Sequence, residues 1–407
     1  MDPNAIVTGL ARLAPRGPGT DAERRAALWL AQVLRDDLGR EVRTETVWVR
    51  PQRAAVLALH AAAGVAASVV AASQPAIGLG IATVALASWC LDQLGFAHLG
   101  RRFTPARATQ NLVSPPTAAT ASGRQRIVKL VIAAAYDAPR TGIARREVFR
   151  RALARLHELT GGHLPGAGAV IALALAAVAG LAGARLGGID AGWVGAIQLV
   201  PTIVLLGALG LAVDAGLARI GPGANDPVSG AAVAIALAAE LDRDPPRHMG
   251  VELVLAGAGD GPSLGMRAFA RARRKRYRRE ATAVIHLAAC GRGRPRWWVS
   301  DGPLVPLRFH PSMRELATRV GGAPYRGHGA SGGWRARLVR WPAITLGCLE
   351  DEGWPTGSGL ASDTPESVDP AAMRSALDVA RRLVRALDED LAKRAKGSRA
   401  QGSDPAE

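Results

Sequence analysis

The sequence predicts an α/β fold, with a mixed, mostly parallel sheet and helices on both faces, interrupted by two inserted pairs of membrane-spanning helices. Three observations lead to this prediction. Strand-like and helix-like segments alternate over most of the chain, which is typical of a sheet covered by helices. Four apolar stretches each have about the length of one bilayer crossing. The mean hydropathy is +0.10 although the chain carries 51 Lys and Arg residues, so apolar and basic residues must be segregated.

The first predicted elements are a helix and a strand. Within residues 20–39, Thr20 and Glu23 have the spacing of a capping box, and apolar residues recur with the helical period up to a stop signal at Gly39. Residues 41–49, EVRTETVWV, alternate between polar and apolar types and therefore predict a strand.

The later elements continue this alternation. Strands are predicted at 126–135, 250–258, 282–289 and 343–348, and helices at 228–241, 263–280 and 370–392. The polar segment from residue 393 to 407 has the composition of a disordered tail.

Four apolar stretches form two predicted transmembrane hairpins, with arms at 54–73 and 76–97 and at 166–184 and 193–213. Two buried, Ala-rich helical pairs of a soluble protein are the alternative. Stretches of this length without a central charge are uncommon in soluble domains, so membrane crossings are favoured. Gly and Ala recur at near four-residue spacing, which predicts close packing into a four-helix bundle.

The distribution of arginines predicts the orientation in the membrane. Basic residues flank the outer ends of both hairpins, at Arg50, Arg53, Arg101, Arg102, Arg107, Arg150, Arg151, Arg155 and Arg219, whereas the short connecting loops hold only Arg185. The positive-inside rule therefore places all the soluble segments in the cytoplasm. The predicted parts are peptidase-like segments 1–53, 98–160 and 219–392, hairpins 54–97 and 161–218, and the tail 393–407.

The net charge of +17 has two interpretations, nucleic-acid binding or contact with anionic lipid. The run RARRKRYRRE at 271–280 has cations at helical spacing but no interleaved aromatic residue beyond Tyr277, which disfavours nucleic acid. Membrane lipid is therefore the expected partner, with a merely solvated basic helix as the alternative. The three cysteines include no CxxC pair, so neither a disulfide framework nor a cysteine zinc site is expected.

Several motifs outside the hairpins resemble the dinuclear zinc exopeptidases, a family that includes leucyl aminopeptidase and glutamate carboxypeptidase. GPGANDPVSGAA at 221–232 is similar to the family's Gly-Ala-x-Asp-x-x-Ser-Gly signature, and AAYDA at 134–138 stands where the family has His-x-Asp. DTPESVD at 363–369 is similar to the closing motif. The resemblance implies a zinc-exopeptidase fold, and it implies that Asp226 corresponds to the carboxylate that bridges two zinc ions.

The same resemblance implies that most of the family's metal ligands are absent. The family's first His falls on Ala135, its later Asp on Ala288 and its final His near Gly359, while the carboxylate often found near Ser331 is missing. Two zinc ions need about three protein ligands each, so these vacancies argue against a dinuclear centre.

The general base is affected in the same way. The family's Glu-Glu pair falls on Gly259 and Asp260, so the base is lost and an acid remains only at the ligand position. The remaining metal candidates are Asp226, Asp260 and His286, with Asp137 as an acid that would support a ligand without binding the metal itself. No cofactor is expected, and Asp226 is expected to satisfy backbone N–H groups at a turn or helix start.

Three functions remain open from the sequence. The preferred one is a non-catalytic, membrane-anchored binding or scaffold protein whose cleft binds a peptide or protein. The second is a membrane-bound zinc aminopeptidase with a rearranged or single-metal site at Asp226, Asp260 and His286. The third is a small transporter regulated by its soluble domain, which the nearly uncharged crossings disfavour.

Overall fold

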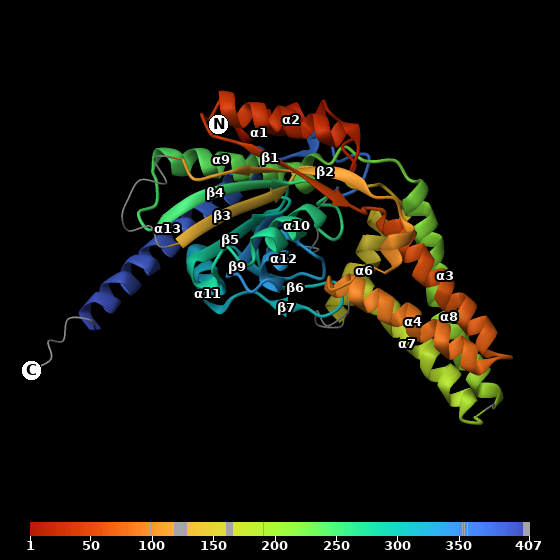
Figure 1. The fold of residues 1–407 in the computed structure, drawn as a ribbon. Helices are drawn as coiled ribbons and strands as arrows, with labels where there is room; N and C mark the ends of the chain where they lie inside the picture. Colours follow the sequence, from red (N-terminus) through yellow and green to blue (C-terminus); the bar gives the residue numbers. More distant parts are fainter. Residues whose placement is uncertain are drawn as a thin grey trace, which may run out of the picture.

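A mixed nine-stranded sheet lies beside a bundle of long helices that projects from one end of it (Figure 1). The structure is a computed structural model, and it describes residues 1–407 except 98, 118–127, 160–165, 190, 352, 354, 356 and 402–407. Its strands are β1 (Arg43–Val49), β2 (Arg107–Ser114), β3 (Val128–Ala135), β4 (Met249–Ala256), β5 (Thr282–Leu287), β6 (Arg294–Asp301), β7 (Leu307–Arg308), β8 (Ala323–Arg326) and β9 (Ala343–Leu349).

The sheet is parallel at its centre and antiparallel towards its edges. The order is β1-β2-β4-β3-β5-β9-β6-β7, with β8 paired to β6. Strands β4, β3, β5 and β9 run parallel, whereas β1–β2, β2–β4, β9–β6 and β6–β7 are antiparallel. The prediction of a mostly parallel sheet is thus right for the centre and wrong for the edges. The helical hairpin between β1 and β2 returns the chain to where it left, so these two strands pair antiparallel.

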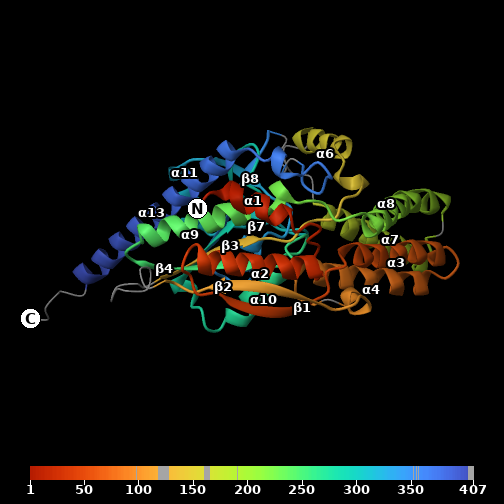
Figure 2. The ribbon, with the colours of Figure 1, turned by 90° about the horizontal axis from the view of Figure 1, so that it is seen from above.

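Helices cover both faces of the sheet (Figure 2). On one face lie α1 (Pro3–Ala11), α2 (Asp21–Asp36), α9 (Gly230–Arg243), α11 (Pro311–Val320) and α13 (Pro370–Gln401); on the other lie α10 (Leu264–Arg273) and α12 (Gly332–Leu338). Strand β3 shows why two layers are needed. Leu130 and Ile132 enter the first core and Val131 and Ala133 the second, because successive side chains of a strand point to opposite faces.

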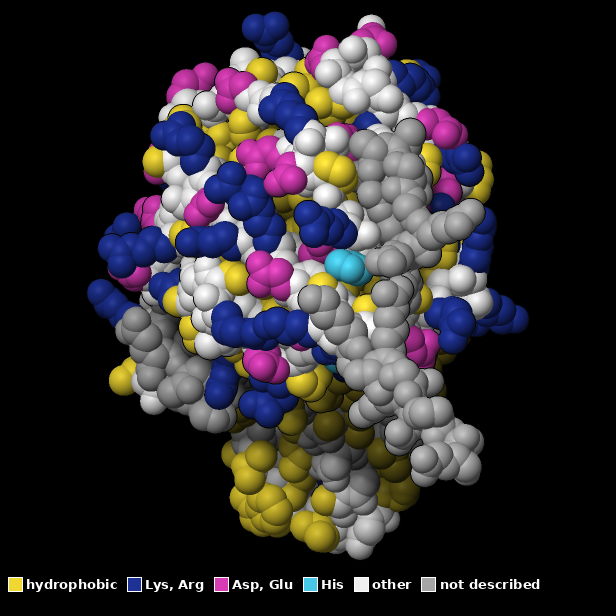
Figure 3. All heavy atoms as spheres, turned by 90° about the vertical axis from the view of Figure 1, so that its left-hand side faces the viewer, with side chains coloured by type: hydrophobic (Ala, Val, Ile, Leu, Met, Phe, Trp, Pro, Cys, Tyr) yellow, Lys and Arg dark blue, Asp and Glu magenta, His cyan; other side chains and the backbone are white. Residues whose placement is uncertain are grey.

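The four long apolar helices are α3 (Arg53–Ala71), α4 (Pro75–Leu94), α7 (Ala167–Leu186) and α8 (Gly192–Leu217). By length and composition each is apolar enough to cross a membrane. They pack together around small residues: a Cβ on Gly64 would lie 2.6 Å from Leu175 and 2.8 Å from Leu205, each on a different helix. Their outer surface is apolar, whereas the domain above carries many charged side chains (Figure 3).

Short helices complete the described chain: η1 (Gly100–Phe103), η2 (Ile143–Arg145), α6 (Glu147–Leu159), η3 (Ala224–Ser229), η4 (Arg279–Ala281) and η5 (Pro365–Ser367). Two predicted helix ends differ from the structure. Helix α10 stops at Arg273, so most of the basic run 271–280 is not α-helical. Helix α13 continues past residue 392 to Gln401, so the described part of the expected disordered tail is helical, and an ion pair between Arg394 and Asp390 on successive turns supports it.

Candidate functional site

The candidate site lies where the central parallel strands end. Ala135 ends β3, Asp260 follows β4, His286 lies near the end of β5, and Asp226 precedes α9. All four line one cavity of about 270 Å³. The structure therefore brings together the three predicted candidates Asp226, Asp260 and His286 at the edge where ligands bind in open α/β sheets.

Asp137 lies directly behind this cavity and holds its wall in place. It is fully buried, and its carboxylate accepts hydrogen bonds from the backbone N–H groups of Gly259 at 2.7 Å and Asp260 at 2.8 Å. Burial, together with the nearby carboxyl of Glu23, raises the pKa of Asp137 to about 8. Asp137 thus orients the segment after β4 without entering the cavity.

Gly259 is packed too tightly to carry any side chain in this backbone. A Cβ there would overlap the Cβ of Ala135 and would lie 2.7 Å from Oδ1 of Asp137. The positions that the resemblance assigns to a metal ligand and to the general base are therefore in contact with each other. No space remains between them for an ion or for a catalytic carboxylate.

Asp226 does not have the expected role at the start of α9. Its carboxylate accepts a hydrogen bond from the hydroxyl of Ser358. The backbone N–H groups of Asn225 and Asp226 are instead satisfied by Asp363, at 2.6 and 3.3 Å. The expectation that Asp226 caps the helix or turn is therefore wrong for the described contacts, because a carboxylate from the distant closing motif already occupies that position.

A guanidinium group fills the space between the two acidic candidates. Arg145, on η2, donates to Asp260 at 2.9 Å and to the hydroxyl of Ser358 at 3.3 Å, and Ser358 in turn binds Asp226. The side chain of Arg145 crosses Gly359, where a Cβ would overlap its aliphatic part. Gly359 has a φ of +68°, a conformation that also favours glycine. A side chain at 359 and the seated Arg145 therefore exclude each other.

Arg150, on α6, extends this contact. It donates to the carbonyl oxygens of Pro355, at 3.1 Å, and Ser358. Both arginines belong to the segment that leads from β3 into the second hairpin, so they tie that segment to the loop before the closing motif. Sequence reasoning missed Arg145 and used Arg150 only for topology; the run ARREVFRR gave no local signal of a partner more than 100 residues away.

His286 is buried and uncharged. Its Nδ1 has no hydrogen-bond partner in the described part of the chain, and a Cβ on Gly332 would lie 2.7 Å from its Nε2. Burial lowers the pKa of His286 to about 4, so the ring is neutral at pH 7. The ring lines the same cavity as Asp226 and Asp260 but forms no hydrogen bond with either.

The glycine-rich loop on the other side of the cavity is organised by an acid that the sequence did not reveal. Asp301, at the end of β6, accepts hydrogen bonds from the N–H groups of Gly329 at 2.8 Å and Ser331 at 3.0 Å. Ser331 accepts the N–H of Trp334 and so caps α12. The carboxylate that the family often has near position 331 is missing from this sequence, but Asp301 supplies a carboxylate to the same loop from β6.

These residues do not fit a pair of zinc ions. No cluster of three or more His, Cys, Asp and Glu side chains that could hold a metal occurs among the described residues. Asp260 is already paired with a cation, and Asp226 accepts a hydrogen bond from a hydroxyl, so the one carboxylate without a cationic partner in this pair is too few to hold two zinc ions.

Comparison with solved structures identifies the fold. Bacteroides thetaiotaomicron glutaminyl cyclase, solved with bound N-acetylhistamine, is similar with a TM-score of 0.52 and 12% identity, over 94% of this chain and 96% of that one. A leucine aminopeptidase precursor from the same organism has a TM-score of 0.50 and 12% identity, over 94% and 95%. A Zn-dependent exopeptidase from Parabacteroides distasonis has a TM-score of 0.50 and 11% identity, over 94% and 96%.

No family model matches the sequence, and none of the curated proteins compared with it matches. The structural likeness confirms the zinc-exopeptidase fold that the motifs predicted. At this identity it concerns the fold alone.

Proposed function

We propose that this chain of zinc-exopeptidase fold is a membrane-anchored binding or scaffold protein in which an arginine has replaced the metal centre. Its four long apolar helices anchor it in the bilayer. Its soluble segments lie on the cytoplasmic side, and the remaining cavity binds a peptide or protein segment.

The contact of Arg145 with both sides of the cleft is the observation that carries this proposal. The guanidinium of Arg145 lies between Asp260 and Ser358 and carries a fixed positive charge. This charge balances the negative charge of the cleft carboxylates, which metal ions would otherwise balance. Unlike a metal ion, the guanidinium has no open coordination position at which water could be activated. The closed contact between Gly259 and Ala135 removes the place for a base as well.

The anchoring rests on the helices and on the arginines beside them. The apolar stretches have mean hydropathies of 1.4 to 2.2, and their outward side chains include exposed Val84, Leu173 and Ile203. All four domain-side ends carry nearby arginines, whereas the far loops hold only Arg185. This asymmetry supports a cytoplasmic soluble domain.

The cavity supports a small ligand rather than a large one. Its volume of about 270 Å³ is near the lower limit for ligand pockets. Trp298 and Tyr325 line one side, with ring centroids 5.1 Å apart, and offer an apolar surface beside the polar groups. A peptide end of one or two residues fits this combination.

One experiment tests the absence of catalysis. The full chain is purified in an uncharged detergent, its zinc is quantified, and hydrolysis of aminoacyl-nitroanilides is assayed. We expect substoichiometric zinc and no turnover above the Asp226→Ala variant. Stoichiometric zinc together with turnover that Asp226→Ala abolishes would overturn the proposal.

One observation favours the rival single-metal aminopeptidase: the unpartnered Nδ1 of His286 lies in the cavity that Asp226 and Asp260 also line. That function predicts one zinc per chain, lost in His286→Ala. Sidedness is tested separately with a reporter fused after residue 407, for which external activity would contradict the cytoplasmic assignment.

A further inference from the structure

A second cavity, of about 680 Å³, lies where the domain meets the helical bundle. It is bordered by the end of β1, by the turn that follows α4, and by α10 (Figures 1 and 2). Five arginines line it: Arg50, Arg101, Arg102, Arg267 and Arg271. Within the described part of the chain no acidic side chain lines this cavity, which we call the arginine groove.

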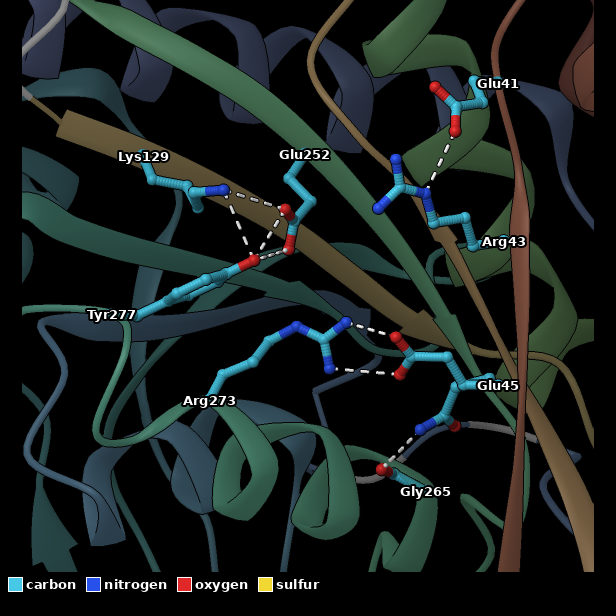
Figure 4. A network of polar contacts seen from close by, with 9 residues as sticks. Glu41, Arg43, Glu45, Lys129, Glu252, Gly265, Arg273 and Tyr277 are labelled. Atoms are coloured by element: carbon cyan, nitrogen blue, oxygen red, sulfur yellow. Dashed lines mark hydrogen bonds and ion pairs between the residues drawn. The ribbon is translucent and has the colours of Figure 1, made fainter.

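Two carboxylates on elements that border the arginine groove, Asp92 on α4 and Glu45 on β1, are already engaged. Asp92 forms a two-pronged ion pair with Arg101, at 2.6 and 3.0 Å. Glu45 is paired with Arg273, which joins α10 to β1 (Figure 4). Farther along, Glu252 accepts hydrogen bonds from Lys129 and Tyr277 in the same view.

The remaining arginines of this region have no acidic partner among the described residues. Arg267 donates to the carbonyl oxygen of Gly95 at 2.9 Å, and Arg335, just behind it, donates to that of Pro262 at 2.7 Å. Nη1 of Arg335 is buried with no hydrogen-bond partner in the described chain. Arg102 and Arg271 are exposed and make no ion pair there.

The arginines of this region lie close enough together to lower one another's pKa. Burial and then the neighbouring Arg271 lower the pKa of Arg267 to about 10. Burial and then Arg267 and Arg101 lower the pKa of Arg335 to about 9. A concave surface with this excess of cations attracts an anion from solution or from a membrane.

The position of the groove indicates which anion. Helix α4 ends at Leu94 and α3 begins at Arg53, so the groove lies at the level where these helices would leave the bilayer. Two exposed aromatic side chains line it, with exposed fractions of 73% for Trp48 and 69% for Phe96, and Phe103, 83% exposed, follows the lining residue Arg102 in the chain. Aromatic residues beside basic ones are typical of the membrane–water interface.

We propose that the arginine groove binds the headgroup of an anionic phospholipid, with Arg102 and Arg271 contacting its phosphate and Trp48 and Phe96 lying against the start of its acyl chains. This inference rests on the proposed anchoring in the membrane and extends it to a defined lipid site. The sequence predicted lipid contact from the basic run 271–280. The proposed site instead lies at α10 and the turn after α4, and includes only Arg271 from that run.

The test uses the full chain in uncharged detergent, with native mass spectrometry to count bound phosphatidylglycerol and phosphatidylcholine. We expect wild-type protein to retain phosphatidylglycerol selectively. Each arginine near an anionic headgroup contributes about fivefold, so R102Q/R271Q should bind it about 25-fold more weakly. The matched control R243Q/R247Q removes the same charge at the C-terminal end of α9 and just after it, a region that does not border the groove, so it should change nothing.

Three results would overturn the inference: equal retention of phosphatidylcholine, an unchanged R102Q/R271Q variant, or displacement of the lipid by excess inorganic phosphate alone. Extraction of membranes with alkaline carbonate separates this failure from failure of the anchoring. A chain that stays in the membrane but shows no lipid selectivity contradicts only the groove. A chain released into solution contradicts both.

Discussion

Arginines gather at two places in this molecule, and the two differ in how their charge is balanced. In the cleft, Arg145 pairs with Asp260, and Arg150 binds carbonyl oxygens of a loop. In the arginine groove, five arginines share one paired carboxylate, Asp92. Arginines that are paired with a carboxylate of the protein stabilise the fold, whereas arginines without such a partner can bind an anion from outside the protein. The following predictions test that distinction, from the largest effect to the smallest.

The largest effect is expected at the one balanced pair of the groove. The side chains of Arg101 and Asp92 are 5% and 1% exposed. Asp92→Asn leaves a buried guanidinium without its counter-charge, and the free energy of unfolding should fall by about 3–5 kcal/mol. Thermal unfolding in uncharged detergent measures it. The control Asp21→Asn, in an exposed pair with Arg24, should destabilise the protein far less, because solvent screens that pair. Equal costs for the two variants would contradict the assigned difference.

Removing the cleft cation should have the next largest effect. Arg145→Ala leaves Asp260 unpaired, and because both side chains are about a quarter exposed, the cost should be about 2–3 kcal/mol. The neighbouring Arg146 is exposed, and Arg146→Ala is the matched control. If added zinc restored the stability of the Arg145→Ala protein completely, the cleft would be a metal site that arginine merely blocks.

Combining substitutions at Gly359 and Arg145 tests the same contact more sharply. Gly359→Ala should cost about 1–3 kcal/mol, because the new Cβ overlaps Arg145 and the residue has positive φ. In the Arg145→Ala background the overlap disappears and only the backbone strain remains. The two costs should therefore be less than additive in a double-mutant cycle, and strict additivity would show that Arg145 does not cross this glycine.

The pH dependence of stability should reveal the contribution of His286, the uncharged side chain of the cleft. The folded-state pKa of His286 is about 4, below its ordinary value of 6.5. Between these values the unfolded chain binds a proton that the folded chain excludes, so stability is complete above pH 6.5 and declines as pH falls. From pH 6.5 to 5 the loss should be about 2 kcal/mol. His286→Gln should flatten this part of the profile, and an unchanged slope would assign it to other groups.

The smallest effect is expected for the unbalanced arginines of the groove. In lipid-free, uncharged detergent, R102Q/R271Q should unfold within about 0.5 kcal/mol of the wild type, because neither side chain has a hydrogen-bond or ion-pair partner among the described residues. Added phosphatidylglycerol should then stabilise the wild type but not the variant. A marked loss of stability without lipid would show that these arginines serve the fold, as Arg145 does.

Much of the architecture could be predicted from local patterns. Alternating and helical periods located β1, β3, β4, β5 and β9 and the helices α2 and α9 with small errors at their ends. Strands β7 and β8 were missed because two and four residues carry little periodic signal, and β6 was missed because its eight residues, RPRWWVSD, do not alternate regularly between polar and apolar types. The edge pairing also escaped prediction, because register depends on partners far away in the chain.

The candidate site was predictable only in part. The motif around Asp226 located one wall of the cleft, and Asp260 and His286 do line the same cavity. Arg145, Asp301 and Ser358 were not predicted, although they set the charge balance and hold the loops. Each acts on residues more than 25 positions away, a separation at which no local period or spacing operates.

The residues by themselves determined that the chain has four long apolar helices, an alternating α/β domain, and Ala or Gly where the resemblance expects metal ligands. These are properties of composition and period, and the hydrophobic effect turns them directly into buried faces and membrane-length helices. Only the tertiary structure decided which cation lies beside Asp260 and which arginines remain without a counter-charge. That outcome depends on the distances between segments brought together by folding, and Coulomb interactions follow distance and burial rather than sequence order.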